Sequence, residues 1–248
     1  MIRWRLPAAG VCLYALALTT SVPATLIDDA LQGASSGRFR LAEARGTLWS
    51  GAGALEIRDA ARNTGIGKRF AWNFLPASLM RGQLAWEITS EQESTRSVVT
   101  LSPSRIEIAN ADLSFPAAAL ALAVPKLSPL QPTGDVLVHI ARLSIARARV
   151  DGDVSVRWQG AGSRLSQISP LGSYELECAG QGASISLTLH TLQAAAPLHL
   201  EGSGMWNLGA ASGYSITARI LPQHQQQLAP LLRLIAVESS DGSFMLQS

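Results

Sequence analysis

The chain has 248 residues, of which 47% are hydrophobic and only 15% are charged, so it can bury a core and does not have the composition of a disordered protein. Its 20 Lys and Arg face 18 Asp and Glu, and two of the cations, Arg3 and Arg5, precede the first apolar stretch. The rest of the chain is therefore neutral. A nucleic-acid-binding surface needs an excess of cations to displace phosphate counterions, so this balance excludes that class of protein.

The N-terminus predicts a membrane anchor. Residues 6–27 contain no charged side chain. As a helix they would span about 33 Å, which is enough to cross a hydrocarbon core of about 30 Å. Arg3 and Arg5 would hold a short tail, residues 1–5, in the cytoplasm and place residues 28–248 outside it.

The alternative is a cleaved signal peptide. Residues 6–18 would form its apolar region, and Val22-Pro23-Ala24 resembles a cleavage site with small residues. Both interpretations place the remainder of the chain outside the cytoplasm.

The exported part is predicted to be all-β. Apolar side chains recur at every second position after residue 37, which is typical of antiparallel strands with one packed face and one wetted face. Turn signals that contain Gly separate these runs. We therefore expect a mainly antiparallel, strongly curved sheet that follows one transmembrane helix. The clearest alternating runs are 84–89, 105–108, 136–140, 153–158, 185–189, 198–200 and 244–246.

Two segments depart from the strand pattern. Pro116 to Val124 begins with a proline at a position that suits the first turn of a helix and continues in Ala and Leu. Gln223 to Ile235 is a second short helix, which Pro230 should kink or split. The proline-rich stretch 116–133 predicts the seam between two halves of the sheet.

A short repeat supports two halves. Trp49-Ser50-Gly51-Ala52-Gly53 recurs as Trp158-Gln159-Gly160-Ala161-Gly162. We expect Trp49 and Trp158 to lie at equivalent places on the same face, with a bend at the small residues that follow each. The spacing also predicts that the second half lacks the strand pair that holds Ile66 to Phe74 in the first.

No motif for catalysis is present. The chain has no nucleophile elbow, phosphate loop or dinucleotide fingerprint. Cys178 is the lone cysteine outside the N-terminal run, and we expect it to be reduced and buried on a strand from Tyr174 to Gly180. The sequence thus predicts no catalytic residue, no cofactor site, no metal site and no enzyme. The histidines, none at a metal-ligand spacing, are His139, His190, His199 and His224.

Four motifs follow one another along the chain. The first is Gly46-Thr47-Leu48-Trp49-Ser50-Gly51, and the second runs from Trp72 to Gly82 with Pro76 and Leu79 inside it. The third is Ser169-Pro170-Leu171-Gly172-Ser173-Tyr174, and the fourth runs from Pro197 to Trp206. In this order they resemble protein N of the bacterial type II secretion system, although the end of the chain from Gln223 matches loosely. The positions that carry the resemblance, which we expect to be structural, are Gly46, Trp49, Gly51, Trp72, Pro76, Leu79, Gly82, Pro170, Gly172, Tyr174, Gly202, Gly204 and Trp206.

The resemblance implies an uncleaved single-pass anchor in the inner membrane and a β-rich domain in the periplasm. It also implies a structural or assembly role in protein export across the outer membrane, with other secretion components as partners, no assigned catalytic residue and no small-molecule substrate. The residues themselves leave one alternative open, a periplasmic module that binds a lipid or another apolar ligand on its apolar sheet face. The two differ in whether the chain's own helices cover that face.

Overall fold

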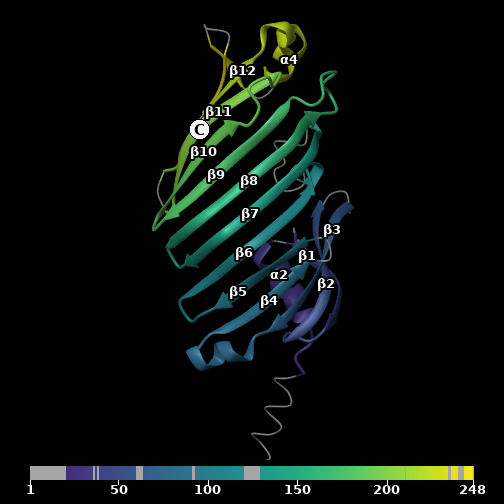
Figure 1. Ribbon diagram of the computed structural model, residues 1–248, viewed down its shortest axis with the longest axis vertical. Coiled ribbons are helices and arrows are strands. Elements are labelled where there is room, and N and C mark those ends of the chain that lie inside the picture. The colour runs from purple at the N-terminus through teal and green to yellow at the C-terminus, as the bar shows by residue number, and fades with distance from the viewer. Residues whose placement is uncertain are drawn as a thin grey trace, which may run out of the picture. The chain divides into compact units, whose positions relative to one another are not determined.

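A computed structural model shows that the chain is built almost entirely of strands (Figure 1). Among the residues that the structure describes, fourteen strands form the sheet in sequence order, except that β14 lies between β12 and β13. The pairs of neighbouring strands described are antiparallel, which confirms the predicted all-β class. The structure describes residues 21–35, 37, 39–59, 64–90, 93–119, 129–209, 211–233, 236–239 and 243–247.

The chain divides into two compact units, Met1–Ser94 and Thr95–Ser248, here called unit 1 and unit 2. This boundary falls in the fifth strand, upstream of the proline-rich stretch 116–133 at which we expected the seam. The elements of unit 1 are α2 (Thr25–Ser35), β1 (Phe39–Gly46), β2 (Ser50–Asp59), β3 (Thr64–Phe74), a 3-10 helix η1 (Pro76–Arg81) and β4 (Leu84–Ser90). Those that follow are β5 (Glu93–Leu101), β6 (Arg105–Pro116), β7 (Pro132–Ala146), β8 (Arg149–Ser163), β9 (Gly172–Gln181), β10 (Ser184–Thr191), β11 (Leu198–Asn207), β12 (Gly213–Ile220), η3 (Pro222–His224), α4 (Gln225–Leu232), β13 (Val237–Glu238) and β14 (Phe244–Gln247).

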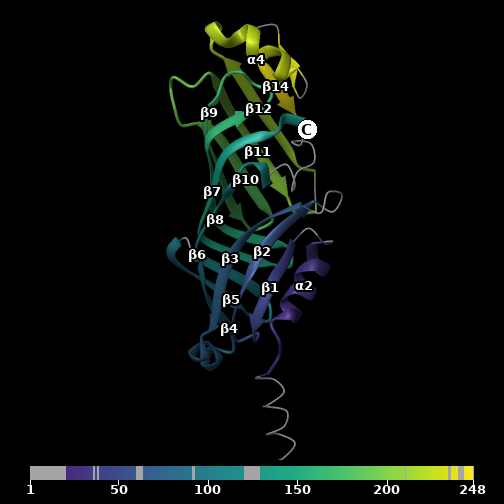
Figure 2. The ribbon, with the colours of Figure 1, turned by 90° about the vertical axis from the view of Figure 1, so that its right-hand side faces the viewer.

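In unit 1 the helix α2 covers an apolar face of the sheet beside β1 (Figure 2). Ile27 and Leu31 are four residues apart, so they share one face of the helix. They pack against a small core that contains Leu41 of β1 and Trp72 of β3, each 7% exposed. In unit 1 the helix that precedes the first strand therefore covers the core.

The folded part begins upstream of Ile27, where we placed the end of the anchor. Pro23 forms a bridge with Thr47, and the Ala24 amide donates to the Gly46 carbonyl at 3.2 Å. Most of the predicted anchor, residues 6–20, lies outside the described residues. Within the described part of the chain, no helix combines the length and apolar character needed to cross a membrane.

In unit 2 the helix α4 lies over one end of the strands β11, β12 and β14. This helix confirms the prediction for Gln223 to Ile235. Pro230 lies inside α4 and does not split it, because the turn continues: the Arg233 amide donates to the Ala229 carbonyl at 3.0 Å. Leu228 and Leu232 anchor it to the sheet.

The other predicted helix, Pro116 to Val124, is described only at its start. Pro116 ends β6, and Ala118 and Ala119 are helical. Residues 120–124 of this prediction lie outside the described residues.

Both Gly-Ala-Gly segments lie in strands, 51–53 in β2 and 160–162 in β8. The predicted distortion lies in the Gly-Ala-Gly segment itself in β8, but not in β2. The pairing of β8 with β9 shifts register between Trp158 and Ala161, and Gly160 has a φ of 56°. In unit 1 the bulge lies in the partner strand, where Glu43 of β1 has a φ of 53°.

The expected equivalence of Trp49 and Trp158 is wrong. Trp158 lies within β8, whereas Trp49 lies in a bend before β2. The counterpart of Trp158 is Trp72: its indole Nε1 donates to the Thr47 carbonyl at 3.0 Å, and that of Trp158 donates to the Thr133 carbonyl at 2.9 Å. Both pairs are separated by 25 residues. The Gly-Ala-Gly segment follows a bend in unit 1 and a strand residue in unit 2, so its recurrence does not mark equivalent positions.

The corrected match also removes the expected missing strand pair. Residues 66–74 lie in β3, and Trp72 of this strand corresponds to Trp158 of β8. The second half therefore has a counterpart to the segment that we expected it to lack.

Candidate functional site

The motif residues form two separate clusters, one in each unit. In unit 1 two indoles hold the loop between β1 and β2. Trp72 donates to the Thr47 carbonyl, and the Nε1 of Trp86 donates to the Leu48 carbonyl at 3.0 Å. Buried indole N–H groups need a partner, and here the partner is the loop backbone. These two tryptophans thus fix the shape of the first motif.

Two glycines of the first motif are required by close approach. Gly46 has a φ of 89°, and a Cβ there would lie 2.4 Å from the Ser50 carbonyl oxygen. A Cβ on Gly51 would lie 2.5 Å from the ring of Trp72. Both positions exclude any larger residue without a backbone shift.

The second motif shapes the turn between β3 and β4. Pro76 is the first residue of η1, and Gly82 ends it in the left-handed conformation with a φ of 67°. Leu79 is 56% exposed on the same helix. Pro76 and Gly82 therefore begin and end the 3-10 helix, while Leu79 exposes an apolar side chain to solvent.

In unit 2 the third and fourth motifs meet at a tyrosine. The Tyr174 hydroxyl donates to the Leu198 carbonyl at 2.9 Å, which joins the start of β9 to the start of β11. Gly172 lies against this ring, and Pro170 follows a cis peptide bond. Burial raises the pKa of Tyr174 well above its ordinary value, so this phenol stays neutral.

An apolar cavity of about 210 Å³ lies beside this cluster. Its floor is the face of the unit 2 sheet that carries Tyr174, Leu198 and Leu200, which we call the apolar face. Leu228 and Leu232 of α4 cover it from above. Of the sequence-predicted positions, the structure brings only Tyr174 to the cavity wall.

The apolar face is closed at one end of β11 and open at the other. Leu198 at the start of the strand is 7% exposed, whereas Trp206 near its end is 58% exposed. Side chains on every second position share a face. Tyr214 of β12, 42% exposed, stands opposite Gly204 and so lies on the same face as Trp206. Trp206 is thus a surface residue.

Cys178 lies on β9 within the predicted strand and shares the apolar face with Tyr174. It is a free cysteine, but it is half-buried rather than buried. Burial raises the pKa of its thiol, which disfavours the reactive thiolate.

The opposite face of unit 2 gathers a polar cluster that sequence analysis missed. The Glu175 side chain is 9% exposed. Its carboxylate accepts a hydrogen bond from the Arg157 Nε at 2.7 Å and lies 3.4 Å from the His190 Nε2. Glu177 joins it, and these carboxylate and imidazole atoms lie within 4.8 Å of one another. The ion pair with Arg157 already uses the buried carboxylate, so the arrangement is a charge network across three strands. Only the strand register brings these positions together.

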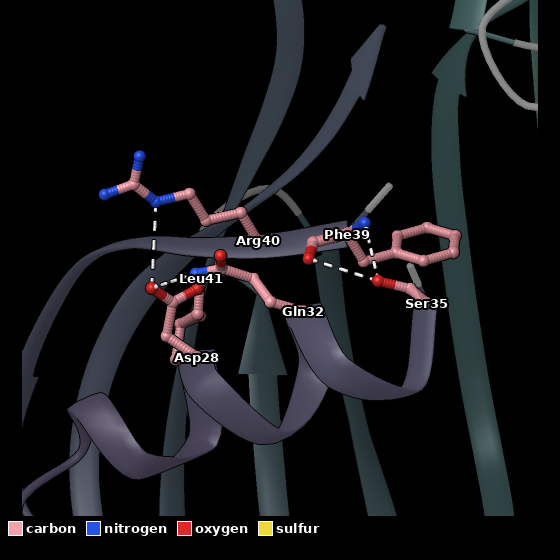
Figure 3. Close-up of polar contacts among 6 residues, drawn as sticks. All are labelled: Asp28, Gln32, Ser35, Phe39, Arg40 and Leu41. Carbon is pink, nitrogen blue, oxygen red and sulfur yellow. Dashed lines mark hydrogen bonds and ion pairs between the residues drawn. The ribbon is translucent and has the colours of Figure 1, made fainter. Parts of the chain in front are cut away.

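Polar side chains of α2 occupy the free edge of β1 in unit 1 (Figure 3). The Asp28 carboxylate accepts from the Leu41 amide at 2.8 Å and lies 3.7 Å from the Arg40 Nε. The Ser35 hydroxyl accepts from the Phe39 amide at 3.0 Å. An edge strand exposes unpaired amides that can template the addition of another strand, and α2 occupies these two.

Comparison with known proteins identifies the family. No curated protein and no solved structure matches the chain significantly. The family model described as type II secretion system (T2SS), protein N, matches residues 38–247, which span both units and all four motifs. The chain therefore belongs to the protein N family of the type II secretion system.

Proposed function

We propose that the protein is a structural or assembly component that helps the type II secretion machinery export proteins across the outer membrane. In this proposal residues 28–248 lie in the periplasm, an uncleaved segment before them anchors the chain in the inner membrane, and other secretion components are its partners. Family membership supports the secretion role. The Arg3 and Arg5 charges before the apolar run support the orientation.

The observation that carries a docking role is the exposure of Trp206. Tryptophan is enriched at the energetic centres of protein interfaces, where its large ring fills a pocket on the partner. Trp206 and Tyr214 lie on one face, because Tyr214 is paired with Gly204, which stands two residues before Trp206 in β11. Gly204 has no side chain to separate the two rings. This open end of the apolar face, which we call the Trp206 patch, is the proposed docking surface for another secretion component.

The free edge of β1 is a poorer docking surface. Strand addition there would need the amides of Phe39 and Leu41, which already donate to Ser35 and Asp28. A partner would first have to displace α2.

The test replaces Trp206 by alanine in the full chain expressed in secreting cells. We expect Trp206→Ala to weaken recovery of crosslinked secretion components by at least about tenfold and to lower secretion, since truncation of an interface hot spot costs about 2 kcal/mol or more. Met205→Ala is the matched control, because Met205 is 53% exposed on the opposite face. Equal crosslinking by both variants and the wild type would contradict this docking surface.

A further inference from the structure

Among the described residues that line it, the cavity of unit 2 has no side-chain hydrogen-bond donor that is not already used. Three lining residues carry a polar side-chain atom: Trp158, Ser163 and Tyr174. Each is already engaged, since they donate to the carbonyls of Thr133, Leu130 and Leu198 respectively. A sugar, nucleotide or peptide would lose its hydrogen bonds to water and gain none here, which excludes these ligands.

The remaining walls are aliphatic. Leu200 and Ala218 come from the sheet, and Leu228 and Leu232 come from α4. An apolar cavity of this kind stays dry and accepts apolar ligands. It also costs stability in proportion to its volume when it is empty, so an apolar occupant stabilises the folded state.

The size of the cavity limits the ligand. Pockets that enclose a drug-sized molecule measure about 300–1,000 Å³. The cavity, at about 210 Å³, is smaller, so it fits part of a slender chain and not a bulky ring system.

A chain that enters the cavity can continue along the apolar face. Leu189 lines the cavity, and Leu187 and Ile185 follow at alternate positions of β10. These three side chains are half-buried. They form an apolar track that leads away from α4 toward the open end of the sheet, where the polar part of a ligand would meet water.

We propose that this cavity binds the end of a single aliphatic acyl chain, with the rest of the chain lying along the β10 track. A free fatty acid and a membrane phospholipid present the same chain. The cavity itself lies outside the Trp206 patch, since neither Trp206 nor Tyr214 lines it. The track reaches that patch at its far end, because Ile185 of β10 is paired with Trp206 of β11.

The test uses the purified full chain and brominated acyl chains, whose bromine atoms quench tryptophan fluorescence on contact. One arm adds dibromostearate, and the other adds vesicles of phosphatidylglycerol with dibrominated chains. We expect dibromostearate to quench the wild type and the quenching to fall by at least half in Trp158→Phe, which removes the reporter on the cavity wall. Trp4 stands beside the proposed anchor and can itself be quenched by vesicles, so only the part of the vesicle quenching that is lost in Trp158→Phe reports on the cavity. Such a loss would identify phospholipid as a source, and a loss seen with the fatty acid alone would identify free fatty acid.

Ala218→Leu fills the cavity and should weaken dibromostearate binding by about tenfold or more. Thr217→Leu is its matched control, because Thr217 is the neighbour on the opposite face of β12 and should bind like the wild type. If Ala218→Leu does not fold, Leu228→Ala tests the site in the other direction: it enlarges the cavity and should retain or strengthen binding.

The proposal is overturned if neither probe quenches the wild type, or if Trp158→Phe and a folded Ala218→Leu respond like the wild type. Trp206→Ala separates this proposal from the docking role. Because Trp206 lies outside the cavity, this variant should lose much less dibromostearate binding than Ala218→Leu, even if it no longer crosslinks to secretion components.

Discussion

At the scale of single residues, four aromatic side chains within or beside the motifs play a common role, because each donates a hydrogen bond to a backbone carbonyl. Trp72 and Trp86 do so in unit 1, and Trp158 and Tyr174 do so in unit 2. Phenylalanine would keep an aromatic ring at these positions but would leave the carbonyl without this hydrogen-bond donor. These positions therefore need an aromatic ring that has a donor at its rim.

Tyr174→Phe tests this at the most buried of these donors. Removal of the hydroxyl leaves the Leu198 carbonyl without its partner, so we expect the free energy of unfolding to fall by about 1–2 kcal/mol at neutral pH. Tyr214→Phe, at an exposed position, should change it by less than about 0.5 kcal/mol. Urea titrations of the three proteins measure both values, and equal effects would contradict the role of the Tyr174 hydroxyl.

The same variant carries a pH signature. The pKa of Tyr174 is raised from its ordinary value of 10.0 in the folded state, because burial disfavours the phenolate. The stabilising contribution of the neutral hydroxyl is thus complete below pH 10 and is lost as the pH rises above it, where the unfolded chain ionises and the folded chain does not. The stability difference between the wild type and Tyr174→Phe should narrow above pH 10.

At the scale of elements, α2 combines two functions in unit 1. Its apolar residues Ile27 and Leu31 cover the core, and its polar residues Asp28 and Ser35 occupy the amides at the edge of β1. A carboxylate that accepts from a backbone amide makes a stronger hydrogen bond than a neutral acceptor does. Asp28 is therefore the residue that ties the helix to the strand.

Asp28→Ala should lower the free energy of unfolding of unit 1 by about 1.5–3 kcal/mol, the range for hydrogen bonds to charged groups. Its matched control is Asp29→Ala, which removes the same charge from an exposed neighbour. The freed β1 edge should also make Asp28→Ala aggregate at lower protein concentration. Thermal unfolding and light scattering measure the two effects, and identical curves for both variants would rule out the edge-capping role.

The elements that the sequence predicted are those in which local pattern and packing agree. Alternation along β10 and at the start of β11 predicted strands because one face is apolar and the other is wetted. The start of α2 was not predicted, because Ala24 and Ile27 continue the apolar run of the predicted anchor. Composition alone does not distinguish an apolar segment that packs on a sheet from one that inserts into lipid. The cluster of Arg157, Glu175 and His190 could not be predicted, because only register brings these three strands together.

The sequence predicts the parts that form the cavity but not the cavity itself. An apolar face was evident from the sequence, and so was a helix after Gln223. Whether that helix would cover the whole face depends on its length and position, which no local pattern encodes. The structure shows that α4 covers the Leu198 end and leaves Trp206 exposed, so the apolar face is covered at one end and exposed at the other.

At the scale of the whole molecule, each unit has a hydrophobic core of its own. The cluster around Leu41 and Trp72 draws its members from residues 24–88, and the cluster around Leu198 and Phe244 draws its members from residues 168–244. The motif clusters follow the same division. Cooperative folding units coincide with such contiguous packing, so a cavity made in one core should loosen that unit first.

Leu41→Ala and Leu198→Ala make the same change in the two cores at positions of equal burial, each 7% exposed. A buried Leu→Ala substitution costs about 2–5 kcal/mol. Hydrogen exchange followed by mass spectrometry should show faster exchange in residues 39–90 for Leu41→Ala and in residues 129–247 for Leu198→Ala. Each variant serves as the control for the other. If either substitution accelerated exchange equally in both ranges, the two cores would belong to one cooperative unit, and the corrected repeat of Trp72 and Trp158 would describe two copies of a motif within a single folding domain.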